Sequence, residues 1–495
     1  MPGTWTVADH VELLRRSLKT AVPYTSGVQA VRKEDLRLFY CSPEGENLKG
    51  TARYIDFGEG NSEESLALLA GACQKAKFGS EEAQGDVLDE DYRKAGKIDV
   101  EDFLVRLDAA EAGILDAVAA ELLPPTHDDM EEKVLRAEMY KLNVYGPGSF
   151  FKAHKDTPRG DNMLGSLVVV LPTQHEGGAL TLSQNESTWV FDSASQLQAH
   201  SGSGSPVVAY IAFFGDVTHS VEPVTSGYRV TLTYNLFVTT SRSTKTVTLP
   251  HSRIVPPQEL ACETSLRALL ADSEWFPNGG HLAFGLTHQY PLPRDPRADR
   301  KSFIDTALLK GCDARLRNAA VRAGLQPQVR LMYRIRDEEG YTYSRPPALV
   351  IMDKPVKVTP GGMHFEYEDF YDGPSLDEDI EQQGTVLQEV NERGRLLREG
   401  KVKGEGNGDD SEEPAAKRQK LNHQEDDGTQ GNADFAGELV CWVTPPEEKN
   451  KAGSEYTTHL GNDYGESFVY GHAELFVRIP KVGEEGRSVV EADEE

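Results

Sequence analysis

Cysteine is scarce in this chain, and its cysteines do not pair in sequence. Only 5 of the 495 residues are cysteine. No two have the Cys-x-x-Cys spacing, and they lie at Cys41, Cys73, Cys262, Cys312 and Cys441. This pattern argues against a disulfide framework and predicts reduced thiols in an intracellular protein.

Long apolar runs are also missing. Residues 1–20 mix Asp, Glu, Arg and Lys among the apolar positions, so they lack the apolar core of a secretory signal. The run from Val207 to Phe214 is too short to cross a bilayer. We therefore expect a soluble protein of the nucleus, the cytoplasm or both, with no membrane partner.

Positive charge is in short supply. The chain has 52 Lys and Arg residues against 80 Asp and Glu residues, which gives a formal net charge of −28. This charge disfavours nonspecific binding to nucleic acid and to anionic membranes. A chain of 495 residues also exceeds what one hydrophobic core normally organises, so we expect two domains and flexible segments.

Two short segments carry the chemistry that is present. The first is His154-Lys155-Asp156, and the second is His219, with Arg229 ten residues later. Side chains two residues apart on a strand point to the same side, so His154 and Asp156 can reach one metal ion. Two imidazoles and one carboxylate on one face are a common ligand set for iron(II) that activates oxygen. The segments therefore predict an iron site with His154, Asp156 and His219 as ligands.

The interval between these segments is rich in short strand-like runs. The runs contain Val, Ile, Thr and aromatic residues, and turn signals such as Glu176-Gly177-Gly178 separate them. The runs are residues 167–171, 179–182, 188–191 and 207–214. Their spacing is typical of a small antiparallel β-sandwich or barrel.

The segment that contains Arg229 alternates like a strand, with Arg229 and Thr231 on one face. A guanidinium that faces inward needs an anionic partner, because an unpaired buried charge is costly. A dicarboxylate cosubstrate would supply one, and the planar fork of Arg can bind a carboxylate through two hydrogen bonds. The hydroxyl of Thr231 can reach the same group, and Tyr145 places another hydroxyl nearby.

With these residues in view, the segment from about Tyr140 to Val238 resembles the catalytic domain of prolyl 4-hydroxylase-type iron(II) and 2-oxoglutarate dioxygenases. The likeness rests on the opening at Tyr145–Asp156, the turn at Glu176–Leu180, and the closing His219 with Arg229. The whole chain is also similar to fungal members of this superfamily for which no substrate is known.

The resemblance implies a double-stranded β-helix (jelly roll) that holds iron(II), 2-oxoglutarate and O2. In that fold, the iron ligands would be His154, Asp156 and His219, and the residues at 2-oxoglutarate would be Arg229, Thr231 and Tyr145. The implied reaction hydroxylates a C–H bond and releases succinate and CO2, with ascorbate as a further candidate requirement.

Three interpretations of the function stay open. A protein or peptide substrate of prolyl type is favoured by the resemblance, although collagen-type prolyl hydroxylases usually have Lys where this chain has Arg229. The second interpretation is an oxygenase for a small molecule or nucleic acid. Nucleic-acid demethylases of the superfamily carry a second Arg six residues after the first, and here that residue is Asn235. The third is a non-catalytic binding or scaffold protein that retains the fold.

The predicted fold class is α+β, with N-terminal helices, the jelly roll and a second α+β region. Residues 1–135 are predicted to be mainly helical, and the strongest helix is expected over Val100–Leu123 because its apolar residues make one stripe. Residues 136–240 form the jelly-roll domain. Residues 241–373 and 437–482 form the C-terminal α+β region, with a degenerate second jelly roll as an alternative.

Residues 374–436 have few large apolar groups, so we expect an acidic disordered linker. A basic cluster within this linker resembles a monopartite nuclear localisation signal. The residues that would bind an import receptor are Lys417, Arg418 and Lys420. Residues 483–495 are predicted to be a frayed acidic tail.

Overall fold

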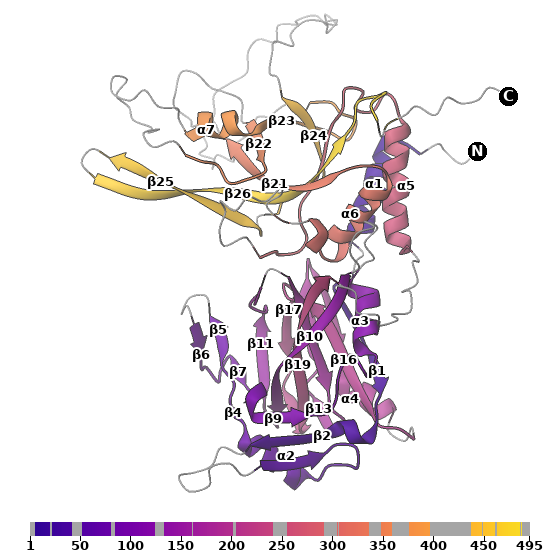
Figure 1. Cartoon of the computed structure of the whole chain (residues 1–495), viewed down its shortest axis with the longest axis vertical. Helices are drawn as coiled ribbons and strands as arrows, with labels where there is room; N and C mark the ends of the chain where they lie inside the picture. Colours follow the sequence, from indigo (N-terminus) through magenta and orange to yellow (C-terminus); the bar gives the residue numbers. More distant parts are fainter. Residues whose placement is uncertain are drawn as a thin grey trace, which may run out of the picture.

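The structure is a computed structural model, and it describes most of the chain. The described residues are 5–19, 22–41, 52–80, 85–123, 133–160, 162–200, 204–240, 255–291, 304, 306–335, 348–358, 376–396, 437–447, 449–460, 463–485 and 487. Two lobes are visible, a lower β-sandwich and an upper mixed sheet with helices (Figure 1).

One layer of the lower lobe is a seven-stranded antiparallel sheet. Its spatial order is β1-β16-β12-β19-β10-β8-β4. The strands, in that order, are Tyr24–Ala30, Val207–Phe214, Met163–Val170, Arg229–Thr240, Lys133–Tyr145, Gly96–Asp99 and Gln74–Lys75. The central strand β12 is buried along its whole length. Its run of Val and Leu therefore forms the core of the sandwich, because both faces of the strand are covered.

The second layer is a five-stranded sheet in the order β15-β14-β17-β11-β7. These strands are Ser187–Phe191, Leu180–Gln184, Thr218–Val221, Phe150–His154 and Arg93–Lys94. A short pair, β13 (His175–Gly177) with β18 (Val224–Gly227), joins the same lobe. The two layers face each other, since Phe213 on β16 contacts the ring of His219 on β17. This arrangement is the jelly roll expected for residues 136–240, completed by strands from the N-terminal region.

The N-terminal region contains more strand than the sequence predicted. Its described residues contain the α-helices α1 (Val7–Lys19), α2 (Glu63–Ala72) and α3 (Ile114–Leu122) and the strands β1 to β9. The strands not bounded above are Arg37–Cys41 (β2), Ala52–Asp56 (β3), Phe78–Ser80 (β5), Gly85–Val87 (β6) and Phe103–Val105 (β9). The prediction of a mainly helical region was therefore wrong.

The expected helix over Val100–Leu123 shows why that prediction failed. The α-helix covers only Ile114–Leu122, Val100–Asp102 form a short 3-10 turn, and Phe103–Val105 form β9. Phe103 and Val105 are buried, whereas Leu104 between them is 66% exposed. All three residues are apolar, so the sequence does not show that burial alternates from one residue to the next. Such alternation is typical of a strand.

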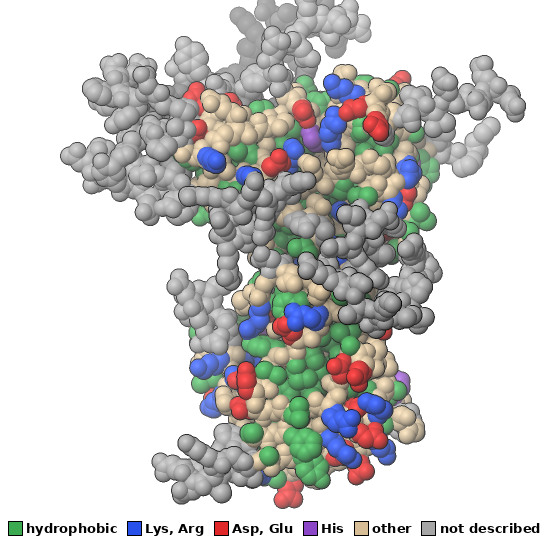
Figure 2. All heavy atoms as spheres, viewed as in Figure 1, with side chains coloured by type: hydrophobic (Ala, Val, Ile, Leu, Met, Phe, Trp, Pro, Cys, Tyr) green, Lys and Arg blue, Asp and Glu red, His purple; other side chains and the backbone are tan. Residues whose placement is uncertain are grey.

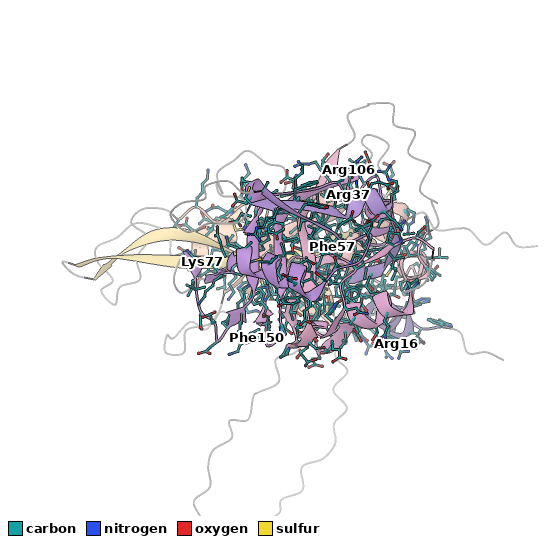
Figure 3. The ribbon with its side chains drawn as sticks, turned by 90° about the horizontal axis from the view of Figure 1, so that it is seen from below. Arg16, Arg37, Phe57, Lys77, Arg106 and Phe150 are labelled. Atoms are coloured by element: carbon teal, nitrogen blue, oxygen red, sulfur yellow. The ribbon has the colours of Figure 1, made fainter. Side chains whose placement is uncertain are left out.

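A three-stranded sheet, β3-β2-β9, closes the lower end of the sandwich. Seen from below, Phe57 lies near the middle of this end, while Arg37 and Arg106 lie toward one edge (Figure 3). Phe57 is only 3% exposed. It therefore belongs to the core that this sheet covers.

The upper lobe contains a sheet whose strand pairing runs in a circle. Strand β20 pairs with both β24 and β26, so six strands close on themselves, and β25 extends β26 as a hairpin. The strands in spatial order are Gly280–Phe284 (β20), Glu438–Thr444 (β24), Thr385–Val390 (β23), Ala348–Met352 (β22), Pro327–Ile335 (β21), Asp463–Ile479 (β26) and Lys451–Leu460 (β25).

Two pairings in this sheet, β20 with β24 and β23 with β24, are parallel. A jelly roll is built from antiparallel strands. The alternative of a degenerate second jelly roll was therefore wrong, and the region is an α+β domain whose helices include α5 (Pro257–Ala271) and α6 (Gly311–Arg322).

Helix α1 belongs to the upper lobe, although it comes first in the chain. Val11 and Leu14 share a buried apolar cluster with Cys262 and Leu266 of α5. Arg15 also donates a hydrogen bond of 2.6 Å to the carbonyl oxygen of Val443 on β24. Figure 1 shows α1 beside α5, far from the other N-terminal elements.

Part of the predicted linker is ordered. Helix α7 (Leu376–Gln383) and strand β23 lie within residues 374–436, and Ile380, Leu387 and Val390 are buried. These apolar residues supply the burial that a disordered segment lacks, so the linker prediction was wrong for residues 376–396. Residues 397–436, with Lys417, Arg418 and Lys420, lie outside the described residues.

The predicted acidic tail is described only at its start. Residues 483–485 and Arg487 are described, and Arg487 is buried. Its guanidinium donates hydrogen bonds to the carbonyl oxygens of Phe276 and Pro480. The first residues of the tail are therefore fixed to the domain, and residues 488–495 lie outside the described part.

All five cysteines are free thiols. Among the described helices, none has the length and apolar content needed to cross a membrane.

The two lobes meet through a buried polar contact. Asp216, in the turn between β16 and β17, accepts a hydrogen bond of 3.1 Å from Nδ1 of His288 in the upper lobe. Lys310 places its Nζ 4.0 Å from the same carboxylate. The rings of Phe214 and His288 also touch, with centroids 4.6 Å apart.

Candidate metal centre

The structure brings the three predicted ligands together between the two sheets of the lower lobe. His154 ends β11, Asp156 follows two residues later, and His219 lies on β17. Antiparallel pairing places His154 directly opposite His219. One ligand atom from each of the three residues lies within 4.8 Å of the others. Among the described residues, this group could hold a metal ion.

Contacts with backbone carbonyl groups fix the orientation and the tautomer of the two imidazole rings. Nδ1 of His154 lies 2.9 Å from the carbonyl oxygen of Lys152. Nδ1 of His219 lies 3.0 Å from the carbonyl oxygen of Val217. A carbonyl oxygen can only accept a hydrogen bond, so each Nδ1 carries the proton and each Nε2 keeps its lone pair for a metal.

The carboxylate of Asp156 is held by a residue that sequence analysis missed. The hydroxyl of Ser166, on β12 of the opposite sheet, donates a hydrogen bond of 2.6 Å to Oδ2 of Asp156. The other oxygen, Oδ1, lies 3.8 Å from Nε2 of His219. The available signal was one serine inside the apolar run of residues 163–170. A buried hydroxyl there needs a polar partner.

Aromatic rings shield the two histidines from water. Phe151 stacks on His154 with ring centroids 3.5 Å apart. Phe213 lies 4.6 Å from the ring of His219. Burial, together with the neighbouring His219, lowers the pKa of His154 to about 3. His154 is therefore neutral at physiological pH, which is the form that binds metal.

These features fit iron(II). The set of two neutral imidazole nitrogens and one carboxylate is the one that open iron(II) sites commonly use. The two histidines come from neighbouring strands of one sheet, Asp156 follows directly after β11, and hydrogen bonds from outside the ligand set orient each of the three.

Arg229 lies at the start of β19, on the inward face of the larger sheet. It is 1% exposed, and its Nε and Nη2 have no hydrogen-bond partner among the described residues. Burial lowers the pKa of Arg229. A guanidinium still carries its charge at neutral pH, so an anion could accept hydrogen bonds from these two unsatisfied donors.

The other two residues predicted at the cosubstrate share this face. Tyr145 pairs with Arg229 across β10 and β19, and its ring centroid is 5.6 Å from the Arg229 guanidinium carbon. Thr231 lies two residues along β19 and is 1% exposed. Gly178 approaches Arg229 so closely that a Cβ there would lie 3.0 Å from Cδ of Arg229.

Sequence analysis also missed a polar stripe on the same inward face. Asn143, two residues before Tyr145, accepts a hydrogen bond of 2.9 Å from Arg93 and donates one of 3.0 Å to Thr233. Lys141 lies two residues earlier on the same strand. The alternation of polar side chains at 141, 143 and 145 with apolar ones at 142 and 144 was a readable signal of this face.

Comparisons with known proteins identify the superfamily of this segment. Residues 140–237 match the family model of the 2OG-Fe(II) oxygenase superfamily. No curated protein matches the chain. The similarity to fungal members of the superfamily therefore stays a prediction.

Several solved structures are similar at low identity. A Pseudomonas putida prolyl-4-hydroxylase is 15% identical with a TM-score of 0.25, over 46% of this chain and 98% of that chain. A prolyl hydroxylase from Trichoplax adhaerens, solved in complex with a hypoxia inducible factor oxygen degradation domain peptide fragment, is 13% identical with a TM-score of 0.25, over 48% and 94%. A viral collagen prolyl hydroxylase from Paramecium Bursaria Chlorella virus-1 is 11% identical with a TM-score of 0.21, over 43% and 96%.

The family match and the position of the candidate ligands agree. His154, Asp156 and His219 all lie inside the matched residues, as do Tyr145 and Arg229. This chain therefore contains a 2OG-Fe(II) oxygenase family domain, over residues 140–237.

Proposed function

We propose that this protein is an iron(II)- and 2-oxoglutarate-dependent dioxygenase that hydroxylates a C–H bond on a protein side chain. One observation carries the proposal. The same matched domain contains a group of three metal-ligand side chains and a buried guanidinium whose Nε and Nη2 have no hydrogen-bond partner in the described part of the chain. The first fits iron(II), and the second fits the free carboxylate of 2-oxoglutarate.

His154, Asp156 and His219 would hold the iron through two Nε2 atoms and one carboxylate oxygen. When bound, iron and 2-oxoglutarate supply the oxidation, in which one atom of O2 enters succinate, the other enters the substrate hydroxyl, and CO2 is released. The protein's part is to fix the ligands, bind the cosubstrate and keep water away. Phe151 and Phe213 serve the last role at the two histidines.

Arg229 would bind the distal carboxylate of 2-oxoglutarate through its Nε and Nη2 donors. Thr231 and Tyr145 would add hydroxyl contacts from the same inward face. This arrangement neutralises the buried guanidinium, which has no carboxylate partner in an ion pair among the described residues.

The prolyl-type protein substrate rests on the resemblance of Tyr145–Asp156 to prolyl 4-hydroxylases. A small-molecule or nucleic-acid oxygenase remains an alternative class, as does a non-catalytic scaffold. The complete set of candidate ligands favours an enzyme over a scaffold, because a protein that had lost catalysis would have no need to keep three oriented ligands.

Succinate release tests the proposal. The full chain is reconstituted under nitrogen with iron(II) and 2-oxoglutarate, then exposed to oxygen with and without ascorbate and cell extract. Wild type should form succinate, and His154→Ala and Asp156→Ala should not. His200→Ala is the matched control, because His200 is exposed and lies outside the ligand group. If wild type and the ligand variants release equal amounts of succinate, the proposal that this protein is a dioxygenase is wrong.

We also propose that the basic cluster Lys417, Arg418 and Lys420 directs the protein to the nucleus through an import receptor. Residues Gly408 to Gln424 fused to a fluorescent reporter should concentrate it in nuclei. A reporter with Lys417, Arg418 and Lys420 all changed to Ala is the control. An even distribution of the unchanged fusion would contradict the proposal.

A further inference from the structure

Three cationic side chains lie around the candidate metal centre without a carboxylate partner in an ion pair among the described residues. They are Arg93 on β7, Lys141 on β10 and Arg159 in the segment between β11 and β12. Arg93 and Lys141 interact electrostatically with ligands of the site, and Arg159 interacts with Lys141. Arg93 opposes protonation of His154, and the charges of Asp156, Arg93 and Arg159 all act on Lys141.

Arg93 is the most buried of the three, at 3% exposed. Its guanidinium lies over the ring of Phe151, 4.3 Å from the centroid, and Phe151 in turn stacks on His154. Its hydrogen-bond acceptors among the described residues are neutral, namely the carbonyl oxygen of Lys77 and the amide oxygen of Asn143. Its Nε has no partner there. The described part of the chain therefore buries a full positive charge beside the site and supplies no counter-charge for it.

Lys141 is half-buried on the inward face of β10. Burial, reinforced by the charge of Arg93, lowers its pKa to about 7. The residue opposite it across the sheet is Asp99, but Lys97 already holds that carboxylate at 2.7 Å. The ammonium group of Lys141 instead lies over the ring of Tyr140, 4.4 Å from the centroid.

Arg159 completes the group at the exposed side. Its guanidinium carbon lies 4.2 Å from the centroid of the Tyr140 ring, and it donates a hydrogen bond to the Tyr140 hydroxyl. Tyr140 thus contacts both Arg159 and Lys141. This contact holds two cations near each other although they repel, which costs free energy unless an anion joins them.

The charges of the loaded site do not provide that anion. Iron(II) contributes +2, Asp156 contributes −1, 2-oxoglutarate contributes −2 and Arg229 contributes +1, so these charges sum to zero. Arg93 and Arg159 then remain as surplus positive charge, and a bound anion would favour the protonated, positive form of Lys141 as well. Asp156, whose charge acts on Lys141, would then be a metal ligand.

We infer that Arg93, Lys141 and Arg159 bind an acidic polypeptide segment, with one or more carboxylates placed beside the carbon to be oxidised. The inference rests on the proposed function, since it names the substrate class of the same site. Arg93 and Lys141 would bind the carboxylate nearest the iron, and Arg159 would bind one farther out. These three residues then select the substrate.

The overall charge favours a short acidic segment over a nucleic acid. The chain carries a formal net charge of −28, and a nucleic acid adds one negative charge per residue along its whole length. A peptide with a few carboxylates meets far less of that repulsion. Acidic and basic side chains are interspersed on the face drawn in Figure 2, so a local cationic site is compatible with the overall charge.

Peptide selection tests the inference. The full chain, held under nitrogen with iron(II) and 2-oxoglutarate so that no turnover occurs, is used to retain members of a randomised peptide library. Asp and Glu should be enriched about tenfold at one or more positions, as expected from ~1.4 kcal/mol per ion pair. Lys141→Met and Arg159→Gln should each reduce that enrichment.

Lys94→Met is the matched control, because Lys94 is an exposed lysine next in the chain to Arg93. It should leave the enrichment unchanged, and thermal unfolding of each variant shows that it is folded. Retained peptides without acidic enrichment, or no retained peptides, would overturn the inference. So would enrichment that survives both site variants.

Succinate release, measured in parallel, separates the two proposals. Succinate without acidic enrichment defeats only the inference about the substrate. Acidic enrichment that depends on Lys141, but without succinate, supports the binding site and defeats the proposed reaction.

Discussion

At the scale of single residues, the candidate metal centre depends on side chains that do not bind metal. Ser166 orients Asp156 from the opposite sheet, and two backbone carbonyls orient the histidines. The spacing of His154 and Asp156 is local, so this pair could be predicted from the sequence, and His219 could be predicted from its place at the end of the strand-rich interval, ten residues before Arg229. Ser166 could be recognised only as a hydroxyl in a buried strand that needs a partner, because that partner, Asp156, lies ten residues away and outside β12.

Replacing Ser166 with Ala should weaken metal binding. The variant removes the 2.6 Å hydrogen bond to Asp156, and loss of such an outer contact typically lowers metal affinity roughly 10- to 100-fold. Titration with manganese(II), followed by electron paramagnetic resonance, measures the change. Ser187→Ala, at an exposed serine of β15, should bind metal like wild type. Unchanged affinity in the Ser166 variant would refute its positioning role.

Replacing Arg229 with Gln should abolish stabilisation by 2-oxoglutarate. The buried charge-assisted contact is worth roughly 2–5 kcal/mol in binding, so the affinity should fall at least ~30-fold. The free protein should be as stable as wild type or more so, because an uncompensated buried charge is removed. Thermal unfolding with and without 2-oxoglutarate measures both effects.

The control for Arg229 is Arg136→Gln, at an exposed arginine paired with Glu138 on β10. It should respond to 2-oxoglutarate as wild type does. If Arg229→Gln binds 2-oxoglutarate as tightly as wild type, the role proposed for the Arg229 guanidinium is refuted.

At the scale of elements, strand-like runs were recognised from composition, whereas the register between strands was not. The runs at 167–171 and 207–214 lie within β12 and β16 or extend them by one residue, and these strands are neighbours in the sheet. Their close approach depends on one glycine. A Cβ on Gly165 would lie 1.9 Å from the carbonyl oxygen of Phe213.

Gly165→Ala should therefore separate β12 from β16 and destabilise the lower lobe by roughly 3–5 kcal/mol, at the upper end of single substitutions. Urea unfolding, followed by tryptophan fluorescence, measures the loss. Gly204→Ala is the control, since nothing lies within 4 Å of a Cβ built at Gly204. Equal midpoints for the two variants would mean that the backbone adjusts freely at Gly165.

The elements outside the jelly roll were harder to predict, for a physical reason. The closed sheet of the upper lobe depends on parallel pairings of β24 with β20 and β23. The paired residues His281 and Val440 are far apart in the chain, so no local pattern reveals the contact. Residues 376–396 have the composition of a linker because they contain few apolar groups, and strand β23 lies between β22 and β24, which are distant in the chain.

At the scale of the whole molecule, the lobes are joined beside the metal centre. Asp216 lies three residues before His219, and its carboxylate binds His288 of the upper lobe. Burial alone would lower the pKa of His288, but the charge of Asp216 outweighs burial and raises it to about 10. The free energy by which the Asp216–His288 pair stabilises the fold therefore changes with pH in a defined direction.

Because the folded pKa of His288 exceeds the ordinary value near 6.5, its contribution to stability is fully present below about pH 6.5 and is lost as pH rises toward 10. Wild type should exceed His288→Gln in unfolding free energy by roughly 3 kcal/mol at pH 6, and the difference should shrink by pH 9. Urea unfolding at the two pH values measures it. His200→Gln, at an exposed histidine, should show no such trend. A difference that stays constant with pH would contradict the assignment.

The place of α1 has a consequence for the order in which the protein acquires its structure. A ribosome makes Val7–Lys19 before the jelly roll, but its partner α5 begins only at Pro257 and the strand β24 only at Glu438. The strands of the jelly roll are synthesised between α1 and α5. The jelly roll can therefore fold during translation, while the upper lobe must wait until β24 and β26 have been made and then bind α1. A fragment that starts after Lys19 should keep the jelly roll yet leave Val11 and Leu14 missing from the core of the upper lobe.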